Sequence, residues 1–237
     1  MQKAISTLVG ILTAAAVLPN HAASPTSLSL PAKQRAGIFT LGNKGAEPLT
    51  AQVRVFRWTQ DANGGEVLEP TDAVIASPPM VKLETGAQQQ FRVMRVKPSD
   101  KQAEEAYRLI VDELPAPDAK PRKGIQLVMR YSLPLFVNVQ NNAEPKLQWR
   151  AEKAANGKAV LVAENTGNAH AQLSNITFQT TSAKDALTLA NGLAGYVLPG
   201  NTWKRELEVS PASLNQGRLN ATVNGMPIQT EVRFAAP

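Results

Sequence analysis

Short stretches in which apolar and polar residues alternate recur along almost the whole chain, and this pattern constrains the fold more than any other feature. Val53–Trp58 is one such stretch, and Asp61–Gly65 after it supplies the asparagine and glycines of a tight reversal. A period of two places successive side chains on opposite faces of a strand. The 3.6-residue period of an amphipathic helix is hard to find. The sequence therefore predicts an all-β protein.

A polar stretch without periodicity, residues 138–145, interrupts this pattern. Such a stretch is typical of a linker between domains. The number and spacing of the strands before it suggest an immunoglobulin-like sandwich. We expect an N-terminal immunoglobulin-like domain over residues 24–140 and a smaller C-terminal β domain of the same kind over residues 141–237. A single continuous sandwich is the alternative.

Residues 1–23 have the three-part pattern of a secretory signal peptide. Lys3 precedes an apolar run from Ile5 to Leu18, and small residues follow the run. Pro19 ends the run before it reaches the roughly 20 residues that a membrane span needs. We therefore expect export, cleavage after Ala23, and a mature protein in the periplasm without membrane insertion.

The chain has few side chains of the types that act as nucleophiles, general bases or metal ligands. The chain has no cysteine, and His170 is the one histidine that remains after residues 1–23 are removed. A catalytic triad, a thiolate site and a histidine-rich metal site are therefore excluded, and we expect no cofactor and no enzyme activity. We expect His170 to be an ordinary loop or strand-edge residue. The net charge of +6 comes from scattered Lys and Arg without a basic block, which argues against nucleic acid as a partner.

Several motifs become specific when they are taken together, in their order and spacing. They are Val53–Trp58, Ser77-Pro78-Pro79, Tyr107-Arg108-Leu109, Glu113-Leu114-Pro115, Arg130–Val137, Asn165–His170 and Gly195–Gly200. The set resembles the PapD-like family of periplasmic pilus chaperones. Its Phe-Arg-Trp and Tyr-Ser-Leu-Pro-Leu-Phe stretches are more similar to the archaic or alternate branch of that family. The resemblance implies two immunoglobulin-like β-sandwich domains arranged at an angle, with a cleft between them.

The resemblance also implies a function without turnover. A chaperone of this family binds pilus (fimbrial) subunits by donor-strand complementation and delivers them to an outer-membrane usher. The subunit lacks its last strand, and a strand lent by the chaperone covers the open groove. The candidate donor strand carries apolar side chains at every second position, namely Ile125, Leu127, Met129, Tyr131 and Leu133. The alternative is that this face packs inside the chain's own sandwich.

The binding of the subunit's terminal carboxylate departs from the better-known branch of the family. That branch uses an arginine on the first strand and a lysine late in the donor strand, and Ser27 and Pro134 stand at these positions here. A carboxylate taken out of water still needs a cation and hydrogen-bond donors. The candidates for a displaced carboxylate anchor are Arg108, Arg130 and Arg92, of which we favour Arg108.

Two other functional classes are weighed against the chaperone. A structural or adhesive surface subunit would also be a β-sandwich, but it would polymerise, whereas a chaperone would form one-to-one complexes. A sugar-active hydrolase would need a convergent pair of acids, and none is visible in the sequence. A free chaperone that covers its own edge by forming an oligomer is compatible with the leading hypothesis.

Overall fold

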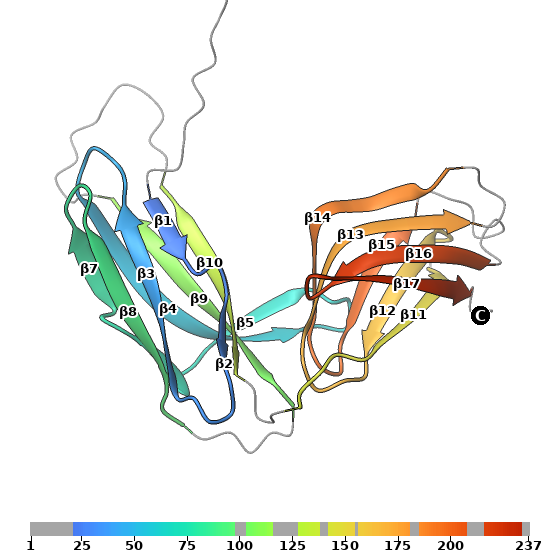
Figure 1. The fold of residues 1–237 in the computed structure, drawn as a ribbon, viewed down its shortest axis with the longest axis horizontal. Coiled ribbons are helices and arrows are strands. Elements are labelled where there is room, and N and C mark those ends of the chain that lie inside the picture. The colour runs from blue at the N-terminus through green and yellow to red at the C-terminus, as the bar shows by residue number, and fades with distance from the viewer. Residues whose placement is uncertain are drawn as a thin grey trace, which may run out of the picture.

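The computed structural model describes residues 21–97, 103–115, 128–137, 142–154, 156–180, 185–207 and 216–233. Within these ranges the regular structure is all strand, which confirms the all-β prediction. No helix in the described residues is long and apolar enough to cross a membrane. The strands form two β-sandwich domains set at an angle, in the shape of a V (Figure 1). Residues 1–20 and 138–141, which hold most of the expected signal peptide and the start of the expected linker, lie outside the described residues.

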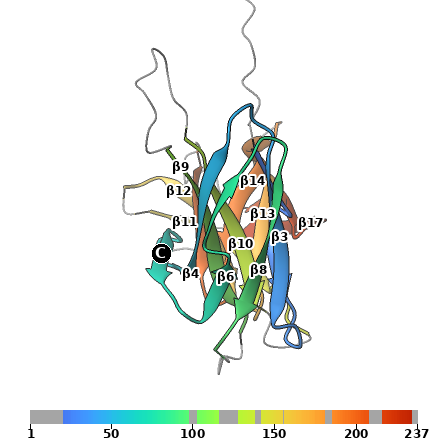
Figure 2. The same ribbon diagram turned by 90° about the vertical axis from the view of Figure 1, so that its left-hand side faces the viewer.

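The first domain packs a smaller sheet against a larger one (Figure 2). The smaller sheet has the order β1-β3-β8-β6, with β1 (His21–Ser24), β3 (Ala36–Asn43), β8 (Gln88–Arg95) and β6 (Val74–Ser77). The larger sheet has the order β2-β10-β9-β4-β5, with β7 paired to β4. Its strands are β2 (Leu28–Leu30), β10 (Arg130–Val137), β9 (Glu105–Leu114), β4 (Leu49–Gln60), β5 (Glu66–Pro70) and β7 (Met80–Leu83).

The alternating pattern places one face of each sheet in the core of this first domain. Phe39 of β3 and Phe91 of β8 are fully buried, and their rings stack with 4.7 Å between centroids. Ile38, the neighbour of Phe39 in the sequence, faces outward and is 54% exposed. Strand β1 pairs with β3 across the expected cleavage site, with Ala23 opposite Leu41, and the chain then crosses to the other sheet as β2.

The second domain is also a two-sheet sandwich. One sheet has the order β11-β12-β15, with β11 (Leu147–Lys153), β12 (Ala159–Asn165) and β15 (Thr202–Leu207). The other has the order β14-β13-β16-β17, with β14 (Leu187–Val197), β13 (Ala171–Thr180), β16 (Gln216–Val223) and β17 (Met226–Arg233). Leu161, Leu173 and Phe178 are among the fully buried residues between the two sheets.

A buried asparagine fixes the loops of the second domain that face the first. Asn165, at the end of β12, is completely buried. Its side-chain amide donates hydrogen bonds to the carbonyls of Ala169 (2.7 Å) and Val197 (3.0 Å). Its carbonyl oxygen accepts from the backbone N–H of Gly167 and of Lys146. Because the amide satisfies four backbone groups, it holds together the loop after β12 and the end of β14, which together meet the first domain.

A cross-strand charge cluster joins the three central strands of the larger sheet in the first domain. Asp112 on β9 accepts hydrogen bonds from Arg54 on β4 (2.6 Å) and from Arg130 on β10. Burial alone would raise the pKa of Asp112, but the two arginines outweigh it and hold the pKa below its usual value. The ionised carboxylate therefore ties the start of β10 to the centre of the sheet.

We expect Asp112→Asn to lower the free energy of unfolding by about 1–2 kcal/mol at pH 7, because both arginines lose a charged partner but stay in contact with water. The pKa of Asp112 is lower in the folded chain than in the unfolded chain. Its contribution is thus present above about pH 4 and is lost as the pH falls through the folded-state pKa. Urea unfolding at pH 7 and at about pH 2.5 measures the difference between the two proteins. An equal loss at both pH values would contradict the assignment.

Candidate functional site

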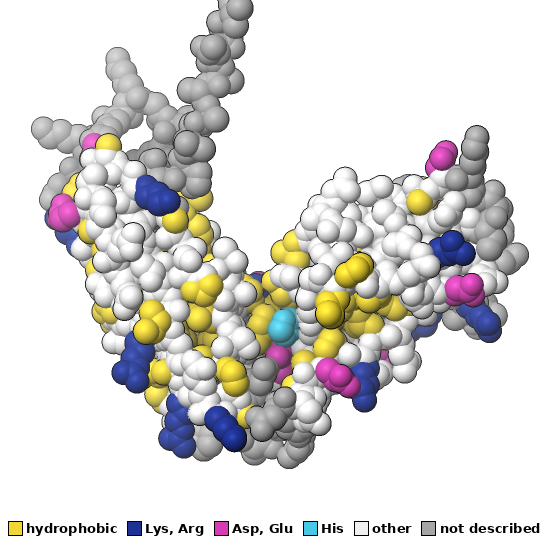
Figure 3. Space-filling view, in the orientation of Figure 1, with side chains coloured by type: hydrophobic (Ala, Val, Ile, Leu, Met, Phe, Trp, Pro, Cys, Tyr) yellow, Lys and Arg dark blue, Asp and Glu magenta, His cyan; other side chains and the backbone are white. Residues whose placement is uncertain are grey.

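The molecule is deeply hollowed between its two domains, and hydrophobic side chains gather on both walls of the hollow (Figure 3). Where the domains meet, a small apolar cluster connects them. Trp58, Ala106 and Phe136 of the first domain bury themselves against Leu198 of the second, and Tyr196 packs against the group. The functional features described next lie on the strands that carry this cluster, mainly β4, β9 and β10.

Within the described residues, one side of strand β10 is only partly covered. The strand pairs with β9 along its whole length, from Arg130 to Val137. On its other side β2 covers β10 only from Leu135 to Val137, in parallel. Among the described residues no strand pairs with that side of β10 between Arg130 and Pro134. An unpaired edge of this kind is a template for a strand from another chain.

The backbone geometry shows which groups face this edge. The N–H of Glu113 donates to the carbonyl of Met129, so the hydrogen bonds to β9 are made by the odd-numbered residues of this strand. The N–H and C=O groups of Arg130 and Ser132 therefore point away from β9, toward the open side. Pro134 offers only its carbonyl there, because proline lacks an N–H.

The proposed donor side chains divide into three groups. Ile125 and Leu127 lie outside the described residues. Met129 and Tyr131 are half-buried at a crevice between the two sheets of the first domain. Leu133 is only 6% exposed and belongs to the chain's own core, so the apolar face that another chain can contact ends at Tyr131. Leu133 therefore packs inside the chain's own sandwich, which is the alternative considered in the sequence analysis.

The side chain of Tyr131 is suited to an apolar contact. Burial, followed by the negative charge of Glu113, raises the pKa of its hydroxyl. A tyrosine hydroxyl is uncharged at neutral pH even at its usual pKa, and this shift favours the neutral form further. Its ring packs against the edge of the core of the first domain.

Arg108 lies on β9 at the junction of the domains. Its guanidinium carbon is 3.7 Å from the centroid of the Trp58 ring and 5.5 Å from that of Tyr196. Its Nε donates to the Glu66 carboxylate on β5 at 2.6 Å. The side chain is only 13% exposed. Arg108 is also the residue of β9 directly opposite Pro134.

The other two anchor candidates are placed differently. Arg130 is 66% exposed and is engaged by Asp112. Arg92 lies on β8, in the smaller sheet, and points outward because its neighbours Phe91 and Val93 are buried. The structure therefore does not bring Arg92 to β10, and of the three candidates Arg108 is the one at the domain junction.

A polar contact also crosses the junction. The Nδ1 atom of His170, in the second domain, lies 2.7 Å from Oε1 of Glu104, whose carboxyl group is 3% exposed. The same oxygen accepts from the backbone N–H of His170. The imidazole stacks on Phe136 of β10 with 3.4 Å between the ring centroids. His170 lies in the loop directly before β13, in keeping with the expected loop or strand-edge position, and it is also part of the contact between the domains.

Sequence reasoning missed most residues at this junction. Tyr196 stands in the Gly195–Gly200 motif, so a resemblance pointed to its segment but not to its contact with Arg108. Neither Glu104 nor Gln60 is singled out by the sequence pattern. Gln60 contacts the second domain through a residue 136 positions away, which no local pattern reveals.

Comparisons with known proteins agree with this architecture. Residues 22–141, just over half of the chain, match the family model of the pili and flagellar-assembly chaperones, PapD N-terminal domain. A search of curated proteins finds no match. One similar solved chain comes from the CsuC-CsuE chaperone–tip adhesion subunit pre-assembly complex of the archaic chaperone-usher Csu pili of Acinetobacter baumannii. The two chains are 26% identical with a TM-score of 0.70, over 92% of this chain and 100% of the other.

Two further structures share the fold at lower identity. The Pseudomonas aeruginosa CupB2 chaperone is 18% identical with a TM-score of 0.58, over 89% of this chain and 98% of that one. A chain of the Salmonella enterica SafA pilin–SafB chaperone complex is 17% identical with a TM-score of 0.62, over 91% and 98%. The expected fold of two immunoglobulin-like domains and the resemblance stated from the motifs are both confirmed. The chain belongs to the family of pili and flagellar-assembly chaperones that carry the PapD N-terminal domain.

Proposed function

We propose that this chain is a periplasmic chaperone that holds pilus subunits by lending them the open edge of β10 and then passes them to an outer-membrane usher. The observation that carries the proposal is the stretch from Arg130 to Pro134, which pairs with β9 on one side and whose other side, beside an apolar face, is covered by no strand of the described residues. Export by a signal peptide over residues 1–23 is the route to the periplasm in this proposal.

The backbone groups of the edge and its apolar side chains both contribute to binding of the subunit. A strand of the subunit added beside β10 would accept from and donate to the backbone of Arg130 and Ser132, at about 0.5–1.5 kcal/mol for each hydrogen bond. Met129 and Tyr131, with Ile125 and Leu127 before them in the sequence, would enter the groove of the subunit. Each buried apolar side chain contributes roughly 1.5–3 kcal/mol. Together these contributions oppose the cost of association, and their surplus sets how firmly the unfinished subunit is held.

Arg108 supplies the cation for the subunit's terminal carboxylate in this proposal. It lies in the junction and opposite Pro134, so it replaces the missing lysine from the neighbouring strand. Stacking on Trp58 orients the guanidinium and shields it from water, which strengthens a charge-assisted hydrogen bond. Glu66 bonds to Nε, and the two terminal nitrogens are the donors that a second carboxylate would contact.

The two alternatives are less well supported. A structural or adhesive surface subunit is not favoured, because the matching family model and the similar solved structures describe assembly chaperones. The matching family model describes assembly chaperones, so it does not support the hydrolase alternative either.

A first test separates the two faces of the donor strand. Met129→Asp would place a charge in the subunit's groove, and we expect at least a tenfold loss of captured subunit, because an unpaired buried charge costs more than 1.4 kcal/mol. Val128→Asp changes the preceding residue, which is 50% exposed and points to the opposite face, and should leave capture unchanged. Co-purification with a co-expressed pilus subunit measures both variants. Equal capture by the two variants would remove the donor face from the proposal.

A second test addresses the anchor. We expect Arg108→Ala to reduce the yield of the complex far more than Arg95→Ala, which removes an arginine from β8 in the other sheet. Adding two glycines to the C-terminus of the pilin displaces its terminal carboxylate from the anchor. We therefore expect the wild-type chaperone and Arg108→Ala to capture this extended pilin equally weakly. If Arg108→Ala and Arg95→Ala give the same yield with the unextended pilin, Arg108 is not the anchor.

A further inference from the structure

We infer that the hairpin of β4 and β5 is a brace between the two domains, and that Gln60, directly before its turn, positions Arg108 for the cargo. The inference rests on the proposed function, because it explains how the carboxylate anchor is held in place. The hairpin belongs to the first domain by sequence, yet its tip reaches the second domain (Figure 1). The brace consists of residues 60–66, from Gln60 at the end of β4 to Glu66 at the start of β5.

Gln60 joins the domains through both ends of its side-chain amide. Its Nε2 donates to the backbone carbonyl of Tyr196 at 2.9 Å. Its Oε1 accepts from the backbone N–H of Leu198 at 2.7 Å. The amide therefore pairs with the end of β14 as a neighbouring strand would, and a pair of hydrogen bonds fixes direction as well as distance.

The turn beyond Gln60 is itself rigid. The carboxylate of Asp61 accepts from the backbone N–H groups of Asn63 and Gly65, each at 2.8 Å. The Nε2 atom of Gln60 also donates to the carbonyl of Gly64 at 3.2 Å. A turn whose backbone is held at three points transmits the position of the second domain to β5 without bending.

The tip of the hairpin touches the backbone of the second domain. Gly64 has φ of +81°, and a Cβ atom placed on it would lie 2.5 Å from the carbonyl oxygen of Thr202. A side chain at this position would force the hairpin and the second domain apart. Gly86 has nearly the same backbone conformation, with φ of +78°, but a Cβ atom placed on it would have nothing within 4 Å.

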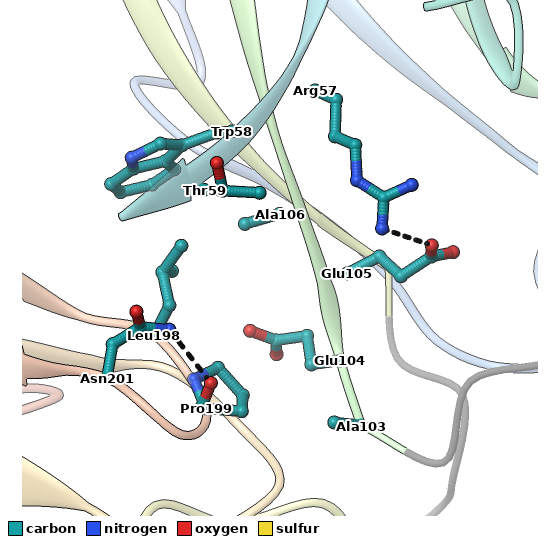
Figure 4. A pocket seen from close by; sticks show the side chains of 10 residues that line it. All are labelled: Arg57, Trp58, Thr59, Ala103, Glu104, Glu105, Ala106, Leu198, Pro199 and Asn201. Atoms are coloured by element: carbon teal, nitrogen blue, oxygen red, sulfur yellow. Dashed lines mark hydrogen bonds and ion pairs between the residues drawn. The ribbon is translucent and has the colours of Figure 1, made fainter. Parts of the chain in front are cut away.

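The apolar cluster at the junction does not fix the domain angle by close packing. A cavity of about 210 Å³ opens beside it, lined by residues of both domains that include Trp58, Glu104 and Leu198 (Figure 4). The indole N–H of Trp58 is buried and has no hydrogen-bond partner in the described structure. Voids of this size leave contacts unmade, so directional hydrogen bonds hold the angle, those of Gln60 on one side together with those of Glu104 to the loop that carries His170.

The same hairpin determines the surroundings of Arg108. Trp58, two residues before Gln60, lies under the guanidinium. Glu66, just past the turn, accepts from Nε of Arg108. Tyr196, whose backbone Gln60 holds, places its ring 5.5 Å from the guanidinium on the side of the second domain. If the brace loosens, Tyr196 moves away and Arg108 loses its shielding from water.

The experiment breaks the brace in two independent ways. Gln60→Ala removes the hydrogen bonds, and Gly64→Ala pushes the domains apart. The controls are Gln90→Ala, which truncates an exposed glutamine on β8, and Gly86→Ala, which imposes the same backbone strain in open space. Because the chain has no cysteine, spin labels can be attached to Lys44→Cys and Lys153→Cys, one in each domain. Double electron–electron resonance then measures the distribution of distances between the two spin labels, and thus between the domains.

We expect both brace variants to broaden or shift this distribution and to reduce capture of the pilin at least fivefold, while the controls change neither. In an Arg108→Ala background Gln60→Ala should cause no further loss of capture, because the brace acts through Arg108. An unchanged distance distribution would overturn the brace, and an additional loss in the Arg108→Ala background would overturn its action through Arg108. If the labelled protein without brace substitutions captures no pilin, the proposed function is refuted. The distance measurement needs no pilin, so it still tests the brace by itself.

Discussion

The arrangement depends on one incomplete strand pairing. β2 is a short parallel partner that covers only Leu135–Val137, so the preceding half of β10 presents backbone groups to no strand of the described chain. An isolated protein with such an edge is prone to unwanted pairing. In the described part of the chain, neither a bulge nor a covering strand blunts the edge between Arg130 and Pro134. Its charged residue, Arg130, is turned toward Asp112.

The transition along β10 from exposed edge to buried core links binding to domain geometry. Tyr131 stands at the border, Leu133 and Leu135 enter the core of the first domain, and Phe136 turns to the other face and stacks on His170. One strand therefore offers an edge at its start and contacts the second domain at its end. Cargo bound along the edge would lie in line with the junction, where Arg108 is held between Trp58 and Tyr196.

Local sequence patterns predicted what depends on local chemistry. Alternation and turn residues indicated the all-β fold, and the lack of a cation at Ser27 and Pro134 directed attention to Arg108. Alternation could not separate the donor face from the core, because Met129 and Leu133 share one face of one strand while only Leu133 lies deep between the sheets. Contacts between the domains, such as those of Gln60 and of His170, join segments that are far apart in the sequence and leave no periodic signal.

The most direct measurement of the central claim is hydrogen exchange at single amides of β10, in the free chaperone and in its complex with a pilin. The account predicts that the N–H groups of Arg130 and Ser132 exchange rapidly in the free protein and become protected in the complex. Those of Tyr131 and Leu133, which face β9, should be protected in both. Protection of Arg130 and Ser132 already in the free monomer, or no change on binding the pilin, would contradict the claim that this edge is the one that is lent.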